Sequence, residues 1–202
     1  MADIAKWPFE ERTCRFVAAR ATRTSADRSS GDSRSSSDGD GTEDHESDCA
    51  GSNGKMTFRT YTDDEYGYRI AYPAEWLVEA EPTGGASFGT RRGSAGAVVY
   101  VDEGLALTLG EYVAAFLDEL AADEYVRAVE ALNRRDVALE AGGTGRAVEY
   151  AYRNAFDERW RLAYLFVLDG TTGYTLGVDW NDADRLEAVA ARIVESFALG
   201  AS

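Results

Sequence analysis

A short run of alternating bulky side chains marks a strand near residue 70. Every second residue from Tyr66 to Tyr72 is bulky and aromatic or aliphatic, and Pro73 follows directly. Alternation with a period of two is typical of a half-buried strand, and proline has no amide hydrogen with which to continue a strand ladder. We therefore predict a strand over 68–72 that ends at Pro73, with Trp76 folding back over the sheet edge as a large apolar plug.

The same criteria predict further strands along most of the chain. Their ranges are 57–61, 86–90, 97–101, 126–132, 137–140, 145–153, 159–168 and 173–180. In the last strand, the bulky residues from Tyr174 to Trp180 fall on one face, and Thr175, Gly177 and Asp179 fall on the other. Asp169-Gly170 marks a tight turn before this strand, so the last two strands are predicted to form a hairpin.

Two amphipathic helices complete the pattern. Thr108 and Glu111 have the spacing of a capping box, in which each side chain satisfies an amide at the helix start. The helix after it is predicted to bury a stripe made of Leu109, Tyr112, Val113, Phe116, Leu117 and Leu120. The final helix is expected to start near Asn181 or Asp182, which suit an N-cap. It is predicted to bury Leu186, Val189, Ala190, Ile193 and Phe197. This order predicts an α+β domain with a largely antiparallel sheet sandwiched by helices.

The first 55 residues differ in composition from the rest. Residues 24–54 contain nine serines and five glycines and no Val, Ile, Leu, Met, Phe, Trp or Tyr. Such a segment cannot bury enough apolar surface to offset its ordering entropy. We expect residues 1–55 to form a disordered or weakly structured N-terminal arm and residues 56–202 to form one domain. The few apolar residues before position 24 either dock on a partner or are upstream sequence, with Met56 as the natural start.

The chain is strongly acidic. It has 36 acidic and 21 basic residues, a formal charge of −15, and its only lysines are Lys6 and Lys55. This balance disfavours nucleic acid and anionic membrane as partners, because both are bound by clustered basic residues. We interpret this acidic, lysine-poor composition as adaptation to high salt, and the competing interpretation is an ordinary acidic cytosolic protein. No apolar run is long enough to span a bilayer, and no secretory signal is visible, so we expect a cytoplasmic protein.

Several motifs together resemble the PsbP-like family, which includes the Mog-like proteins. They are the strand–proline–tryptophan corner of 66–76, the helix opening Leu107–Tyr112, the strand segments 146–150 and 173–176, and the closing stretch Ile193–Phe197. The resemblance covers about 57–199 and implies an α/β/α sandwich, here in an acidic, haloarchaeal-type member. The family's roles are mainly non-catalytic: photosystem II subunits and assembly factors, a binder of a small GTPase, and chaperone-like adaptors. The resemblance therefore implies a protein partner, and the composition argues against the photosystem role.

Residues 56–202 contain no histidine and no cysteine, since Cys14, His45 and Cys49 all precede them. This excludes from that segment a Ser-His-Asp triad, a Cys–His pair and a zinc site built on imidazole or thiolate. We assign no catalytic, cofactor-binding or metal-binding residue and expect no enzyme. The stretch 179–184 loosely matches a calcium loop, but a helix N-cap is the better interpretation. Weak divalent-cation binding by surface carboxylates stays an alternative.

Candidates for a partner surface are the large aromatic and clustered basic residues of the domain. They are Trp76, Trp160, Trp180, Arg134 and Arg135. The competing interpretation is core or rim packing for the tryptophans and ion pairing for the arginines. We therefore predict a non-enzymatic accessory or assembly module with an unidentified protein partner. The alternative is a small-ligand carrier or a carboxylate- or tyrosine-based enzyme, and it requires a cavity between sheet and helices.

Overall fold

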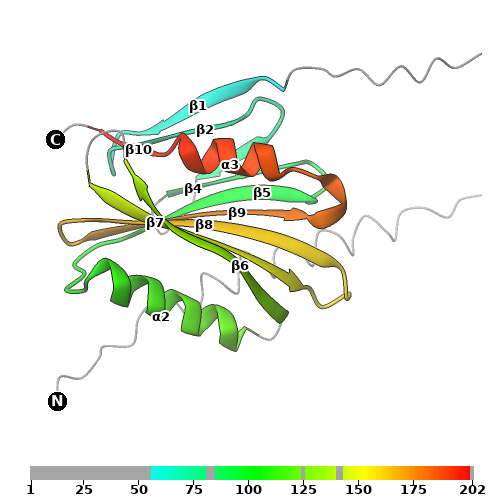
Figure 1. Cartoon of the computed structure of the whole chain (residues 1–202). Coiled ribbons are helices and arrows are strands. Elements are labelled where there is room, and N and C mark those ends of the chain that lie inside the picture. The colour runs from blue at the N-terminus through cyan, green and yellow to red at the C-terminus, as the bar shows by residue number, and fades with distance from the viewer. Residues whose placement is uncertain (1–55, 81–84, 124–125, 140–142, 201–202) are drawn as a thin grey trace, which may run out of the picture.

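Two antiparallel sheets and two α-helices make up the described part of the chain (Figure 1). The computed structural model describes residues 56–80, 85–123, 126–139 and 143–200. The predicted arm over 1–55, with both cysteines and the histidine, lies outside the described residues.

The larger sheet has seven strands in the order β3-β4-β5-β9-β8-β7-β6. Their bounds are β3 (Leu77–Ala80), β4 (Gly85–Gly89), β5 (Ala95–Asp102), β6 (Arg127–Ala138), β7 (Thr144–Arg153), β8 (Arg159–Asp169) and β9 (Thr172–Asn181). A smaller sheet, ordered β1-β2-β10, consists of β1 (Phe58–Asp63), β2 (Tyr68–Pro73) and β10 (Ala198–Leu199).

The large sheet lies between two covering layers (Figure 1). Helix α2 (Leu109–Ala122) covers one face, and helix α3 (Glu187–Glu195) covers the other together with the small sheet. The residues buried on the two faces form two separate apolar clusters. The predicted fold class, an antiparallel sheet sandwiched by helices, is confirmed. The small sheet was not predicted as a separate sheet. Beside α3, it covers part of the face that the prediction assigned to helices alone.

Strand β9 shows how the alternating pattern builds both clusters. Tyr174, Leu176, Val178 and Trp180 belong to the cluster under α3, as their period-two spacing predicted. Between them, Thr175 and Asp179 are buried toward the α2 side at 0% and 2% exposure. The hairpin predicted at Asp169-Gly170 is present, because β8 and β9 pair from Asp169 and Thr172 outward.

Helix α2 begins where the capping box predicted. The Thr108 hydroxyl accepts a hydrogen bond from the Glu111 amide at 3.3 Å, and the Glu111 carboxylate accepts one from the Thr108 amide at 2.8 Å. The predicted apolar stripe is turned toward the sheet. Its fully buried members are Tyr112, Val113, Phe116 and Leu120.

The start of the last helix was predicted wrongly. Strand β9 continues to Asn181, whose side chain caps only a three-residue 3-10 helix, η2 (Asp182–Asp184), by accepting from the Ala183 amide at 3.0 Å. Arg185 follows with a left-handed φ of 51°, which a continuous α-helix does not permit. Helix α3 therefore starts only at Glu187.

The proline corner ends β2 as predicted, but it leads into a strand that was missed. The Trp76 amide donates to the Pro73 carbonyl at 3.0 Å, and the indole is buried at 6% exposure, as expected for the apolar plug. The chain then continues directly into β3. Leu77 and Val78 are both largely exposed on this short edge strand, so no alternation marks it in the sequence.

The two strands predicted over 126–132 and 137–140 are one long strand, β6. Its pairing with β7 is interrupted by register shifts between Arg127 and Glu130 and between Ala131 and Asn133. These shifts lie within the first predicted piece, whereas the gap between the two pieces, 133–136, pairs regularly with β7 and was missed because its four residues are polar and exposed. After α3, the Ser196 hydroxyl accepts from the Ala71 amide at 2.8 Å, and Phe197 stacks on Tyr68. The end of α3 is thereby fixed to the small sheet.

Candidate functional site

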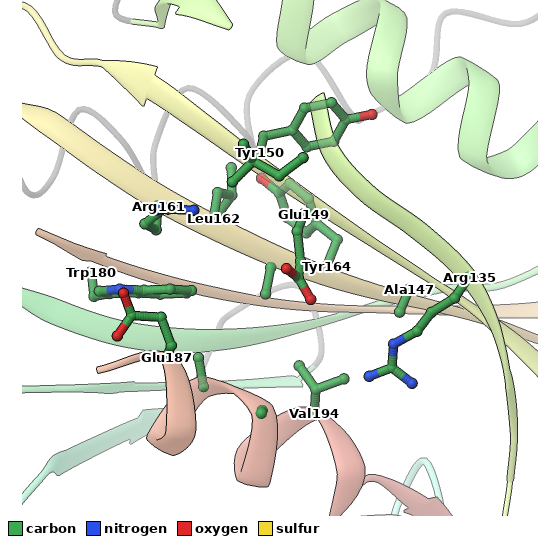
Figure 2. Close-up of a pocket in the computed structure, with 14 residues that line it drawn as sticks. Arg135, Ala147, Glu149, Tyr150, Arg161, Leu162, Tyr164, Trp180, Glu187 and Val194 are labelled. Atoms are coloured by element: carbon green, nitrogen blue, oxygen red, sulfur yellow. The ribbon is translucent and has the colours of Figure 1, made fainter. Parts of the chain in front are cut away.

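A cavity of about 200 Å³ lies between α3 and the face of the large sheet formed by β6, β7, β8 and β9 (Figure 2). Small side chains on both walls leave this space open. Ala147 on β7 and Ala163 on β8 form part of the floor, and Ala190 and Ala191 of α3 form part of the opposite wall. Side chains this small cannot meet across the gap between a helix and a sheet, so the space between them stays unfilled.

Glu149 is the most unusual residue of the floor. By strand alternation it shares the inward face of β7 with Ala147 and Ala151, and it pairs across the sheet with Ala163. It is half-buried, and its carboxylate points into the cavity (Figure 2). Among the described residues, none makes a hydrogen bond or ion pair with this carboxylate. A half-buried carboxylate without a partner can be paired by a cation or a hydrogen-bond donor, and the cavity has room for one.

Trp180 forms the aromatic wall. It lies on β9 opposite Arg161, and its indole ring lines the cavity at 5% exposure (Figure 2). Its Nε1 is buried and has no hydrogen-bond partner within the described part of the chain. An indole face attracts cations through its quadrupole, so this wall is compatible with an organic cation.

Arg161 lines the cavity, but its charge is already compensated. Its Nε donates to the Asp182 carboxylate at 2.7 Å, and Arg159 reaches the same carboxylate at 3.3 Å. The hydrogen bond to Asp182 is the main reason why the pKa of Arg161 is raised above its ordinary value. The guanidinium of Arg161 is therefore held in a structural ion pair at the cavity.

Arg135 reaches the other side of the cavity from β6 (Figure 2). Both Arg135 and Arg134 are exposed, and within the described residues neither forms an ion pair. Arg134 lies close enough to Tyr150 to affect its ionisation, and the Tyr150 ring packs against the apolar cluster on the α2 side of the sheet. Burial raises the pKa of Tyr150, and the positive charge of Arg134 partly offsets this effect. The two arginines predicted as partner-surface residues thus remain available for contacts.

The three tryptophans of the predicted partner surface do not form an exposed patch. Trp76, Trp160 and Trp180 are only 6%, 5% and 5% exposed, because each belongs to one of the two apolar clusters. The core-packing interpretation therefore holds for their rings. Of the five candidates, the structure brings Trp180 and Arg135 together at the cavity, and it places Trp76 and Trp160 elsewhere in the core.

The α2 side of the sheet holds a buried polar network. The Tyr112 hydroxyl donates to Asp102 at 2.9 Å and lies 2.8 Å from the Thr175 hydroxyl. Nearby, burial raises the pKa of Tyr164 well above its ordinary value. A phenol with a raised pKa remains neutral at physiological pH, so it is a poor general base. We interpret this network as structural.

The calcium-loop alternative for 179–184 does not form a convergent site. Asp179 is buried on the α2 side of β9, Asn181 caps η2, and Asp182 binds the two arginines. Across the described ranges, no group of three His, Cys, Asp or Glu side chains could hold a metal ion. In the same ranges, no helix has both the length and the apolar character needed to cross a membrane.

Comparisons with known proteins identify the fold. No family model and no curated protein matches the chain. Among solved structures, CyanoP, the cyanobacterial PsbP of Synechocystis sp. PCC 6803, has a TM-score of 0.55 and 16% identity, covering 74% of this chain and 96% of that one. The Ran-binding protein Mog1p of Saccharomyces cerevisiae has a TM-score of 0.54 and 11% identity, covering 71% and 96%. The fold is therefore PsbP/Mog-like, as the sequence motifs predicted.

Sequence reasoning raised a cavity between sheet and helices only as a condition of the alternative function, and it missed Glu149 and the residues that line the space. One signal was present: Glu149 interrupts an inward-facing row of small residues on β7. The pattern of a single strand does not show whether the missing volume is filled from another element, and here that element is α3.

Proposed function

We propose that this chain is a non-enzymatic protein-interaction module, an accessory or assembly factor adapted to high salt, and that its partner docks against β6. The observation that carries the proposal is the exposure of this strand. β6 is twelve residues long and has eleven exposed residues, and among the strands of the described ranges it pairs only with β7. An edge strand presents unpaired backbone groups that can accept a further strand from another chain.

The side chains of β6 support a docking role. Val129 and Leu132 are 42% and 37% exposed, and Arg134 and Arg135 follow them. Apolar residues next to arginine are typical of interface composition. The register shifts lie in the first half of β6, so the regular stretch from Asn133 to Ala138 is the part best suited to strand addition.

A non-enzymatic role is supported by the chemistry available. Residues 56–202 lack histidine and cysteine, and burial raises the pKa of both Tyr150 and Tyr164. These two phenols, which pack in the cluster on the α2 side of the sheet, are therefore poorly suited to general base catalysis near neutral pH. The yeast protein with the same fold is a Ran-binding protein, which supports a protein partner for this chain. The high-salt adaptation and the cytoplasmic location stay predictions.

A second candidate function is that of a small-ligand carrier or a carboxylate-based enzyme. The cavity beside α3 favours it, because the space contains Glu149 and an aromatic wall. Its volume of about 200 Å³ lies below the 300–1,000 Å³ usual for ligand pockets, so we place this candidate second.

Affinity capture with the full chain in molar potassium chloride tests the proposal. The variant Leu132→Arg places a charge on the exposed face of β6, and Leu77→Arg makes the same change on β3, at the opposite edge of the same sheet. Both residues are exposed, so both variants should keep the wild-type melting temperature. We expect one partner to be recovered with the wild type and with Leu77→Arg, and lost with Leu132→Arg. Equal recovery with both variants would refute docking at β6.

A further inference from the structure

We propose that the cavity beside α3 anchors a basic side chain, arginine or lysine, that the partner protein inserts when it docks on β6. This inference rests on the proposed function and gives the chemistry of the partner. Such an anchor requires three features of the cavity: an acceptor for the positive charge, room for the alkyl part of the side chain, and a position next to β6.

The interior acceptor is Glu149. Its carboxylate points into the cavity from β7, and no residue of the described chain pairs with it (Figure 2). A guanidinium or ammonium group would supply charge-assisted hydrogen bonds to this carboxylate. Glu187, an exposed residue at the start of α3, lines the same cavity and adds negative charge near its edge.

The walls suit the rest of a basic side chain. Ala147, Ala163 and Ala190 offer apolar contact to a methylene stem, and the Trp180 indole lies beside the space that the charged group would enter (Figure 2). A volume of about 200 Å³ corresponds to roughly six or seven water molecules, which is the scale of an arginine side chain.

The charge balance favours a cation over an anion. Arg161 is compensated by Asp182, so Arg135 is the only lining cation without an ion pair among the described residues. Arg135 is exposed, and its side chain can turn toward solvent when a second cation enters. Molar salt screens the overall acidity of the chain beyond about 3 Å, so the direct contact with Glu149 must provide the selectivity.

The position of the cavity links it to the docking strand. Leu132 and Arg135 belong to β6 and also line the cavity. A segment that adds to the regular half of β6 therefore passes next to Arg135 and the cavity that it lines, so that one of its side chains can enter.

Titration of the full chain with short peptides tests the inference. The probes are a blocked pentapeptide, Ala-Ala-Arg-Ala-Ala, the same peptide with citrulline, which is a neutral isostere of arginine, and free butylguanidinium. In molar potassium chloride, the readout is the indole N–H resonance of Trp180, assigned with Trp180→Phe. We expect the arginine peptide to shift this resonance and to bind at least about tenfold more tightly than the citrulline peptide or butylguanidinium.

Three variants separate the alternatives. Glu149→Gln keeps the shape of the side chain and should weaken the arginine peptide at least about tenfold. Glu195→Gln, an exposed residue of α3 outside the cavity, should leave the affinity unchanged. Arg135→Ala should leave the affinity unchanged or increase it.

Four results would overturn the inference. Equal binding of the citrulline peptide, or an unchanged affinity of Glu149→Gln, would show that the charge pair is not used. Loss of binding in Arg135→Ala would indicate an anion site, and butylguanidinium binding as tightly as the peptide would indicate a site for a free organic cation.

The capture experiment separates this inference from the proposed function. Wild-type recovery of the partner by Glu149→Gln refutes the anchor and leaves docking at β6 intact, whereas selective peptide binding without any captured partner refutes the proposed function.

Discussion

Tyr112 on α2 and Asp102 on β5 share a buried hydrogen bond of 2.9 Å, and the same hydroxyl lies 2.8 Å from Thr175 on β9. One phenol thus connects the covering helix to two central strands of the large sheet. All three residues are at most 6% exposed, so water cannot readily replace this contact.

Replacing Tyr112 with phenylalanine removes the hydroxyl and keeps the ring. The buried Asp102 carboxylate then loses one donor, and loss of a buried hydrogen bond to a charged group destabilises a protein by about 1–3 kcal/mol. We expect a loss of this size in urea unfolding at molar salt. Tyr61→Phe is the control, because it removes an outer, 3.4 Å hydrogen bond to Asp63 and should change stability much less. Equal effects of the two variants would mean that the network does not hold α2 on the sheet.

The capping box makes stability depend on pH in the acid range. Hydrogen bonds from the Thr108 amide and hydroxyl lower the pKa of Glu111 below its ordinary value of 4.5. The unfolded chain therefore binds this proton more tightly, so the contribution is complete above about pH 4.5 and disappears as pH falls through the lowered pKa. Glu111→Gln should have a lower melting temperature than wild type at pH 7, and the difference should shrink toward pH 2. A constant difference would contradict the linkage, and Glu195→Gln should follow the wild type throughout.

The two helices show what local sequence can predict. The start of α2 follows from the Thr108–Glu111 box and an apolar stripe, both of which lie within one segment, and the structure confirms them. The start of α3 was misplaced because Asn181 does act as a cap, but of the short helix η2. The left-handed conformation of Arg185 separates η2 from α3, and arginine carries no local signal for it.

The short edge strands and the cavity could not be predicted from periodicity, for a different reason. β3 and β10 are short, and they form because β4 and β2 supply hydrogen-bonding partners. The cavity depends on alanines from β7, β8 and α3 that meet only in the folded chain. The arrangement of Glu149 and Trp180 around one space therefore requires the tertiary structure.

The acidic composition predicts a dependence of stability on salt. Residues 56–202 carry 25 acidic and 13 basic side chains, a net charge of −12. Lowering the salt from about 1 M to about 0.01 M lengthens the Debye length from about 3 Å to about 30 Å, so these charges repel one another over a longer range. We expect the melting temperature to fall at low salt and to recover when potassium chloride is restored. An unchanged melting temperature would show that the acidic excess is incidental.

Deletion of residues 1–55 tests the predicted domain boundary. Residues 24–54 lack large apolar side chains, so removing them should take nothing from the core. We expect the shortened chain to keep its circular dichroism spectrum and to change in stability by less than about 1 kcal/mol. A larger loss would place part of this segment in the fold, with Trp7, Phe9 and Phe16 as the first residues to examine.

Hydrogen–deuterium exchange on the captured complex tests docking at β6 most directly. The free chain and the complex are compared in the same molar potassium chloride, with β3, at the opposite edge of the sheet, as the internal reference. Our account predicts that amides of β6, above all those from Asn133 to Ala138, exchange more slowly in the complex, while those of Leu77–Ala80 do not change. Slower exchange at β3 with unchanged exchange at β6 would contradict it.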